Sequence, residues 1–211
     1  PSMSFIPEFT GSRLHPDTIG DSVLVGTELS WFLETQSILT FSHLRHLSIS
    51  SDHHPGGDIK NLANLNLLEK LDCQLGYTVM DFATLKALLS CTQVQEVNLY
   101  FDRLVPTTKF DWDDTTEENG LQGLELPKLR SFSLAVDHLS PTASPEIVNF
   151  IGRCTTIESL HLTISEAEEA LVVHKLPSLH ELTLSFCQPT SPNFCSEWLT
   201  KLLSPLTHLT Y

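Results

Sequence analysis

Histidine and carboxylate side chains gather in one short stretch, Asp-His-His-Pro-Gly-Gly-Asp at residues 52–58. Imidazoles and carboxylates are ligands that zinc and other divalent cations use in proteins. A proline and two glycines in the same stretch are typical of a polar loop in water, and no second cluster at ligand spacing accompanies it. We therefore interpret residues 52–58 as a surface loop and expect neither a metal nor a cofactor.

Carboxylates are also dense at residues 111–120, Asp-Trp-Asp-Asp-Thr-Thr-Glu-Glu-Asn-Gly. An EF-hand calcium loop needs a glycine at its sixth position and a glutamate at its twelfth, and this run does not have that spacing. The composition favours a solvated loop. Its functional alternative is an acidic rim for a basic partner, which Glu166, Glu168 and Glu169 would extend.

Thiols are the other reactive groups in the sequence. The five cysteines are odd in number and widely spaced, and several lie inside apolar patterns, at positions 73, 91, 154, 187 and 195. This usage favours buried thiols in a reducing compartment over a disulfide framework. Cys195 falls in the first turn of a predicted helix, where the helix dipole favours a thiolate, but no base accompanies it. Phosphate-loop, G-x-S-x-G and H-E-x-x-H motifs are missing as well, so we expect no enzymatic activity.

Charge and hydropathy narrow the class of partner. The chain has 211 residues, 12 of them basic and 26 acidic, for a net charge of −14, which disfavours nucleic acid because its binding depends on phosphate neutralisation. No run approaches the roughly 18 apolar residues of a membrane helix, and the first residues lack the pattern of a secretory signal. We expect a cytoplasmic or nuclear protein without membrane contact, with secretion as the alternative if a signal has been removed.

One short pattern recurs along the chain and must position all these groups. It reads apolar-x-x-apolar-x-apolar and occurs at residues 44–49, 68–73, 94–99, 129–134, 157–162, 179–184 and 206–211. Its copies start 24, 26, 35, 28, 22 and 27 residues apart, and five of these six spacings match the repeat length of leucine-rich repeats. The acidic run lies in the one oversized spacing and is therefore expected to be an insertion.

The alternation at the end of each motif is typical of a half-buried strand. A strand this short cannot bury its apolar face alone, so stacked copies should form one parallel sheet with a continuous leucine core. The pattern predicts an α/β fold, a leucine-rich-repeat solenoid of about seven repeats over residues 41–211. Residues 1–40 are expected to be an N-terminal capping segment with one helix at 27–39.

The segments between the motifs carry unequal helix signals. Asp81 is placed to cap a helix beginning at Phe82, and Ser144 to cap one with Pro145 at its first position. A third helix is expected from Ser191. The connections at 125–128 and 174–178 look too short for much helix, so we expect helical and near-extended returns to alternate in an irregular solenoid.

Two repeats share a more specific form. In residues 88–99 and 151–162 a predicted helix ends on a cysteine, and two residues separate it from the strand motif. This resembles the cysteine-containing leucine-rich repeats of F-box proteins, especially the F-box-like proteins of mushroom-forming fungi. Residues 126–129 and 176–179 look like proline variants from the same group. The likeness covers about residues 41–211 and implies the repeat architecture. Residues 1–40 contain no recognisable F-box module, so it does not imply binding to a ubiquitin-ligase adaptor.

Alternate positions of the strands point away from the core and should line up on the concave face of the sheet. These positions form three rows: His46, Lys70, Glu96, Ser131, Ser159, Glu181 and His208; Ser48, Asp72, Asn98, Ser133, His161, Thr183 and Thr210; and Ser50, Gln74, Tyr100, Ala135, Thr163 and Ser185. The rows are polar and contain one large aromatic residue, Tyr100, of the type that often anchors interfaces.

We predict that this face binds a protein or peptide, with the site centred on Asp72, Asn98, Tyr100, Ser133 and His161. A carbohydrate-binding, lectin-like module is the alternative, because planar polar groups and an aromatic ring also suit sugars, and a hydrolase is disfavoured. The last motif ends at Tyr211. We therefore also expect either self-association through the C-terminal strand edge or further sequence beyond it.

Overall fold

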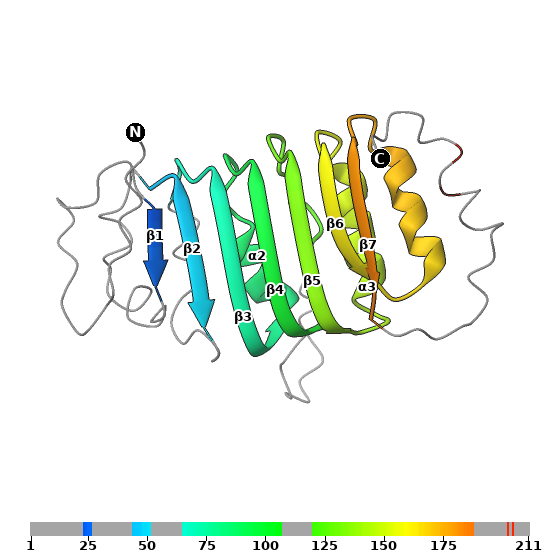
Figure 1. Cartoon of the computed structure of the whole chain (residues 1–211), viewed down its shortest axis with the longest axis horizontal. Helices are drawn as coiled ribbons and strands as arrows, with labels where there is room; N and C mark the ends of the chain where they lie inside the picture. The colour runs from blue at the N-terminus through cyan, green and yellow to red at the C-terminus, as the bar shows by residue number, and fades with distance from the viewer. Residues whose placement is uncertain are drawn as a thin grey trace.

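The described part of the molecule is a single curved layer of strands backed by helical segments (Figure 1). This computed structural model describes residues 23–26, 44–51, 65–106 and 120–187, together with residues 202 and 204. All seven strands are parallel and neighbours in the chain are neighbours in the sheet, in the order β1-β2-β3-β4-β5-β6-β7. Their bounds are β1 Val23–Gly26, β2 His46–Ser51, β3 Lys70–Asp81, β4 Glu96–Val105, β5 Ser131–Leu139, β6 Ser159–Ile164 and β7 Glu181–Phe186.

The repeated motif sets the register of the sheet. Strands β2 to β7 all begin at the third position of a motif, and these first residues are mutually paired from His46 through to Glu181. Just before the strands, backbone hydrogen bonds of 2.7–2.8 Å join neighbouring repeats, for example Gln95 N–H to the Glu69 carbonyl. Sequential parallel strands in constant register confirm the predicted leucine-rich-repeat solenoid.

Apolar motif positions form one continuous core. The first, fourth and sixth motif residues of the repeats from β2 to β6 are at most 2% exposed, which matches the alternation that the sequence shows. Between the sheet and a helix, the rings of Phe132 and Phe150 meet edge to face, with centroids 5.7 Å apart. The strands therefore contribute one face to the core and leave the other face polar.

Helix α2, Phe82–Leu88, returns the chain from β3 to β4. Asp81 caps it as predicted: one carboxylate oxygen accepts a hydrogen bond from the backbone N–H of Thr84 at 2.8 Å. Phe82, Leu85 and Leu88 form its buried side. The next return has no helix in its described part, residues 120–130, where turns with a positive φ at Gly120 and Gly123 lead into β5.

Two helical returns differ from the sequence prediction. Helix α3, Ser144–Arg153, begins one residue early, with Ala143 at the N-cap position, because the Ser144 hydroxyl donates instead to a Glu169 carboxylate oxygen at 2.5 Å. The connection into 174–178 contains a 3-10 helix, η4 (Ala167–Lys175), where a near-extended return was expected. Glu166 and Glu169 close its first turn as a capping box.

Strand β1 is an addition to the predicted set. It lies inside the segment 1–40, which was expected to be a capping segment with one helix, and it pairs with β2 from Val23–His46 to Gly26–Ile49. The helix expected at 27–39, the helix expected from Ser191 and the motif at 206–211 fall outside the described residues, as does the C-terminal edge. In the described part, no helix is long and apolar enough to span a membrane.

Leu160→Ala should destabilise the fold strongly. Leu160 is 1% exposed and lies in β6 between its register partners Phe132 and Leu182, so truncation leaves a cavity in the continuous core. We expect the free energy of unfolding to fall by about 2–5 kcal/mol in chemical denaturation. Thr183→Ala, at an exposed position of the next strand, is the matched control and should change stability by less than about 0.5 kcal/mol.

Asp81→Ala should cost about 1 kcal/mol in the same measurement, because it leaves the Thr84 N–H without its capping oxygen. Asp81→Ser keeps a capping oxygen and should retain most of the stability. Equal losses in the two variants would contradict a capping role for this side chain.

Candidate binding face of the sheet

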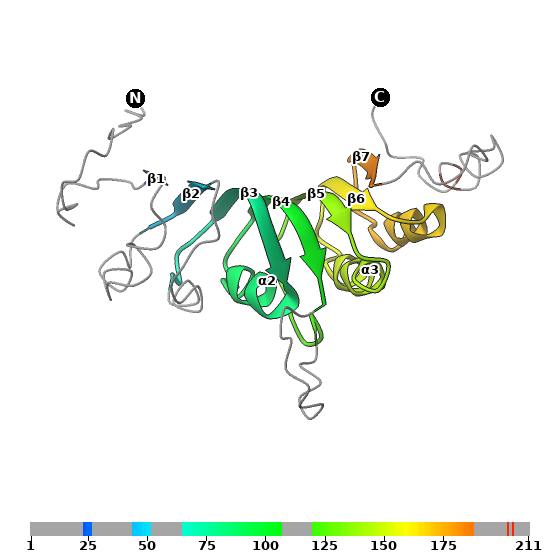
Figure 2. The same ribbon diagram turned by 90° about the horizontal axis from the view of Figure 1, so that it is seen from below.

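The helical segments lie on one face of the sheet, and the opposite face carries no secondary structure in the described residues. In Figure 2 the strands form a shallow arc with α2 and α3 on its outer side, so the open face is the concave one. The strand register aligns a row across this face, which consists of Ser48, Asp72, Asn98, Ser133, His161 and Thr183. This row contains four of the five predicted site residues, and the structure brings them together as the sequence predicts.

Asp72 and Asn98 interact directly. The Asn98 side-chain amide donates a hydrogen bond to Asp72 Oδ1 at 3.0 Å between the paired strands β3 and β4. Asn98 is exposed and Asp72 is half-buried. The pair therefore presents an oriented carboxylate and a planar amide to solvent, next to the half-buried hydroxyl residue Ser133.

Tyr100, the fifth predicted residue, lies two positions further along β4 and is 37% exposed. Its hydroxyl donates to Asp137 Oδ2 on β5 at 2.8 Å, which holds the ring against the sheet face. Asp137 was not among the predicted residues. The signal for it was present, because Asp137 continues the outward alternation of Ser133 and Ala135 into a strand longer than the motif.

Beyond β5 the face becomes less open. His161 Nε2 lies 3.4 Å from Ser185 Oγ, a contact whose donor depends on the imidazole tautomer. Thr163 was expected in the outward third row, but it is 4% exposed. Thr163 lies one residue beyond the last paired residues of β5 and β6. Its hydroxyl accepts a hydrogen bond from Val136 N–H at 3.3 Å, in place of a backbone carbonyl of the neighbouring strand. The third outward row, which contains Tyr100, is therefore interrupted after Ala135 on β5.

Charges on and beside the face fall into two groups. At the starts of the strands, three carboxylates have basic partners: Arg45–Glu69 at 2.5 Å, Lys70–Glu96 at 2.6 Å and Arg130–Glu158 at 3.7 Å. A fourth, Glu181 on β7, accepts a hydrogen bond from Ser159 Oγ at 2.9 Å. Further along the strands, none of the described basic side chains forms an ion pair with Asp72, Asp102 or Asp137. The face therefore carries uncompensated negative charge around Tyr100.

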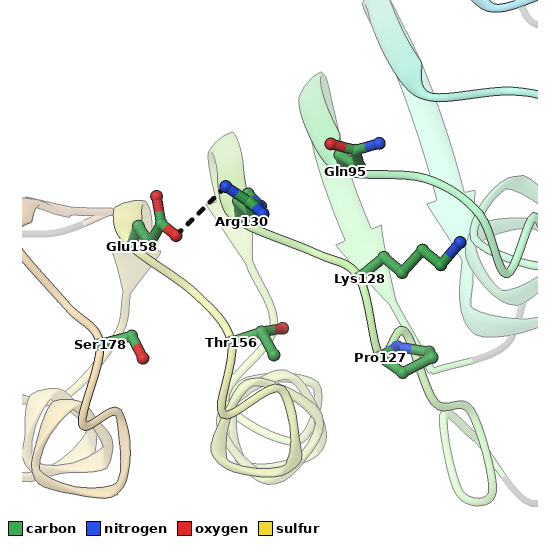
Figure 3. A pocket seen from close by; sticks show the side chains of 7 residues that line it. All are labelled: Gln95, Pro127, Lys128, Arg130, Thr156, Glu158 and Ser178. Carbon is green, nitrogen blue, oxygen red and sulfur yellow. Dashed lines mark ion pairs between the residues drawn. The ribbon is translucent and has the colours of Figure 1, made fainter.

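A separate pocket of about 370 Å³ lies at the strand-start edge, where the turns before β5, β6 and β7 adjoin (Figure 3). It is lined by Gln95, Pro127, Lys128, Arg130, Thr156, Glu158 and Ser178. In Figure 3 the Arg130 guanidinium faces Glu158 while the Lys128 side chain extends the other way, where its ammonium donates to Gln93 Oε1. The two cations are turned apart, so they do not form a combined anion site.

The groups that could do redox or metal chemistry are not arranged for it. Within the described ranges, no three histidine, cysteine, aspartate or glutamate side chains are grouped to hold a metal ion. Burial raises the pKa of the Cys91 and Cys154 thiols to about 11, with weaker opposing effects at Cys154 from the Leu126 backbone and the Arg153 charge. Burial also raises the pKa of Cys73, and it raises the pKa of Cys187 against a smaller lowering by backbone hydrogen bonds. The stretch 52–58, the run 111–119 and Cys195 lie outside the described residues.

Comparisons with known proteins add little beyond this geometry. No protein-family model and no curated protein matches the sequence. Internalin C2 from Listeria monocytogenes aligns with a TM-score of 0.37 and 15% identity, covering 82% of this chain and 70% of that chain. Another Listeria monocytogenes internalin (inlF) aligns with a TM-score of 0.35 and 13% identity, covering 84% of this chain and 56% of that chain. Likeness this weak carries no functional argument, and the relation to fungal F-box-like proteins stays a prediction.

The buried cysteines should resist thiol reagents in the folded protein. Cys73, Cys91, Cys154 and Cys187 are thiols, and the first three are buried. At pH 8 we expect Cys73, Cys91 and Cys154 to react with Ellman's reagent only after denaturant is added. Rapid modification of these three positions in the native protein, located by peptide mapping, would contradict the packing described above.

The Cys91 and Cys154 thiols should make the protein less stable in alkali. Their folded pKa of about 11 lies above the ordinary value of 9.0, so between these pH values the unfolded chain loses protons that the folded chain keeps. Stability should therefore fall as pH rises from about 9 to 11, and these groups should contribute no slope below about pH 8. The decline should be smaller in a Cys91→Ala, Cys154→Ala double variant.

Proposed function

We propose that the chain is a non-enzymatic binding module that recognises a protein or peptide through the concave face of its sheet. The observation that carries the proposal is the aligned polar row from Ser48 to Thr183, with the exposed ring of Tyr100 beside it. Parallel register places neighbouring members about 5 Å apart, so an extended ligand can contact several repeats at once.

The side-chain arrangement supports binding over catalysis. Asp72 and Asn98 hydrogen-bond each other, and Tyr100 is held by Asp137, so these side chains are oriented before a ligand binds. Preorganised aromatic and planar polar groups lower the entropic cost of binding. His161 approaches a serine hydroxyl, Ser185, but at 3.4 Å and without an acidic residue orienting the imidazole among the described contacts.

The sheet face is a better candidate than the strand-start pocket. The pocket contains no aromatic side chain. Of its charged residues, Arg130 and Glu158 already face each other, and Lys128 donates to Gln93 Oε1. Aromatic residues are the commonest anchors of protein interfaces, and Tyr100 provides one at the middle of the sheet. The four described thiols, none of them in a disulfide, also lead us to propose a reducing compartment.

A random-peptide library panned on the full chain tests the proposed face. Peptides enriched on the unmodified protein should bind Tyr100→Ala and Asn98→Ala variants about tenfold more weakly, since the substitutions remove an interface anchor and half of the amide–carboxylate pair. The melting temperature should change little, because both positions are exposed. Glu158→Gln at the strand-start edge is the control and should bind normally.

Two further experiments, a deletion and a glycan array, test a different binding surface and a carbohydrate ligand. Deleting residues 111–118 should affect binding less than either concave substitution. If that deletion abolishes binding and the concave variants bind normally, the concave face is the wrong one. A glycan array probed with the same proteins covers the lectin alternative: sugar binding that depends on Tyr100, without peptide enrichment, would replace a peptide ligand by a carbohydrate.

A further inference from the structure

We propose that the ligand of the concave face is a basic segment, with an arginine or lysine side chain seated on the Tyr100 ring between the carboxylates of Asp102 and Asp137. The inference rests on the proposed function and adds the chemistry of the partner. It comes from three separate observations: an exposed and oriented aromatic ring, carboxylates without cations, and the way the remaining charges of the sheet are paired.

The ring is held in place by a charged group. Tyr100 is 37% exposed, and its hydroxyl donates to Asp137 Oδ2 at 2.8 Å. The other oxygen of Asp137 receives no hydrogen bond from a described donor. A cation over the ring would therefore meet both the negative face of the π-system and a carboxylate oxygen that is already at the surface.

Strand register adds a second carboxylate at the same level. Phe101 pairs with Val136 and Arg103 pairs with His138, which places Asp102 opposite Asp137. Asp102 is half-buried, and it has neither an ion pair nor a hydrogen bond through its side chain among the described contacts. Arg103 is exposed and follows Asp102, but it pairs with neither carboxylate within 4.0 Å.

Near the starts of the strands, three acidic groups have basic partners, and Glu181 on β7 accepts a hydrogen bond from Ser159 Oγ at 2.9 Å. Glu69, Glu96 and Glu158 contact Arg45, Lys70 and Arg130 from neighbouring repeats. Uncompensated carboxylates are concentrated around Tyr100, where Asp72 lies on the adjacent strand and Asp102 and Asp137 lie beyond the ring. This charge pattern is complementary to a cationic ligand and repels an acidic peptide or a phosphate backbone.

Fluorescence anisotropy with a matched peptide set tests the inference on the full chain. The labelled peptides share one Gly-Ser-Xaa repeat sequence and differ only in Xaa, which is arginine, lysine, glutamine or glutamate. We expect binding of the arginine and lysine peptides, weaker at higher salt, and none of the glutamine or glutamate peptides at the same concentrations. Arginine should bind better than lysine, because its planar guanidinium stacks on the ring and reaches a carboxylate bidentately.

Variants locate the cation. Tyr100→Ala and Asp137→Asn should each weaken the arginine peptide roughly tenfold, and Tyr100→Phe, which keeps the ring, should retain most of the affinity. Glu158→Gln removes the same charge as Asp137→Asn, but on the strand-start edge, and should leave the affinity unchanged. Circular dichroism and melting temperatures of all four variants show whether a loss of binding reflects unfolding.

Two results would overturn the inference. One is equal binding, or equal absence of binding, for the arginine and glutamine peptides. The other is equal weakening by Glu158→Gln and Asp137→Asn, which would mean attraction to net charge alone. The library experiment separates these failures from that of the proposed function. Library peptides that depend on Tyr100 but contain no excess of basic residues would leave the binding face in place and remove only its preference for cations.

Discussion

Leucine burial between short parallel strands is the constraint on which the rest of the structure depends. A six-residue strand such as β6 presents only three apolar side chains to the core, Leu160, Leu162 and Ile164, too few to hold it in place alone. Stacking against β5 and β7 brings Leu160 between Phe132 and Leu182 and extends the core by one repeat. The strands must therefore keep constant register, since a one-residue slip would turn every core leucine to solvent.

Constant register also creates the face that we propose for binding. Every outward residue lies beside the residue at the same motif position in the next repeat, so side chains that are distant in sequence become neighbours on the surface. Asn98 reaches Asp72 across 26 positions of sequence, and Lys70 reaches Glu96 in the same way. Such contacts orient side chains before any ligand arrives, which reduces the conformational entropy that binding must overcome.

The returns on the convex side are free to vary because they share only one requirement, to cover the core. Helix α2, the turns at 120–130, helix α3 and the 3-10 helix η4 meet it in different ways. Close packing then adds local constraints. Gly152 of α3 faces η4, where a β-carbon would lie 3.2 Å from the Lys175 side chain and 3.3 Å from that of Val172. Irregular returns thus follow from local packing, while the sheet remains regular.

Sequence periodicity alone determined the strands from β2 to β7 and the outward row from Ser48 to Thr183, because burial of alternate positions leaves a direct trace in residue types. The residue type at a predicted helix start also located the Asp81 cap, whose carboxylate oxygen accepts a hydrogen bond from the backbone N–H three residues along the chain. Local patterns of this kind need no knowledge of distant residues. The four aligned members of the predicted site were likewise foreseeable, since register follows from the motif.

Only the tertiary structure decided features that depend on partners far along the chain. Ser144 looked like a helix cap, but Glu169 from another return takes its hydroxyl. Thr163 has the alternation of an outward residue and is buried instead, because its hydroxyl completes a backbone hydrogen bond where β5 and β6 leave their paired register. The carboxylate that holds Tyr100 comes from a position 37 residues away. At these positions, long-range hydrogen bonds compete with the local preference of the residue and decide its burial or its partner. The sequence pattern does not show which residues will be close enough to form those bonds.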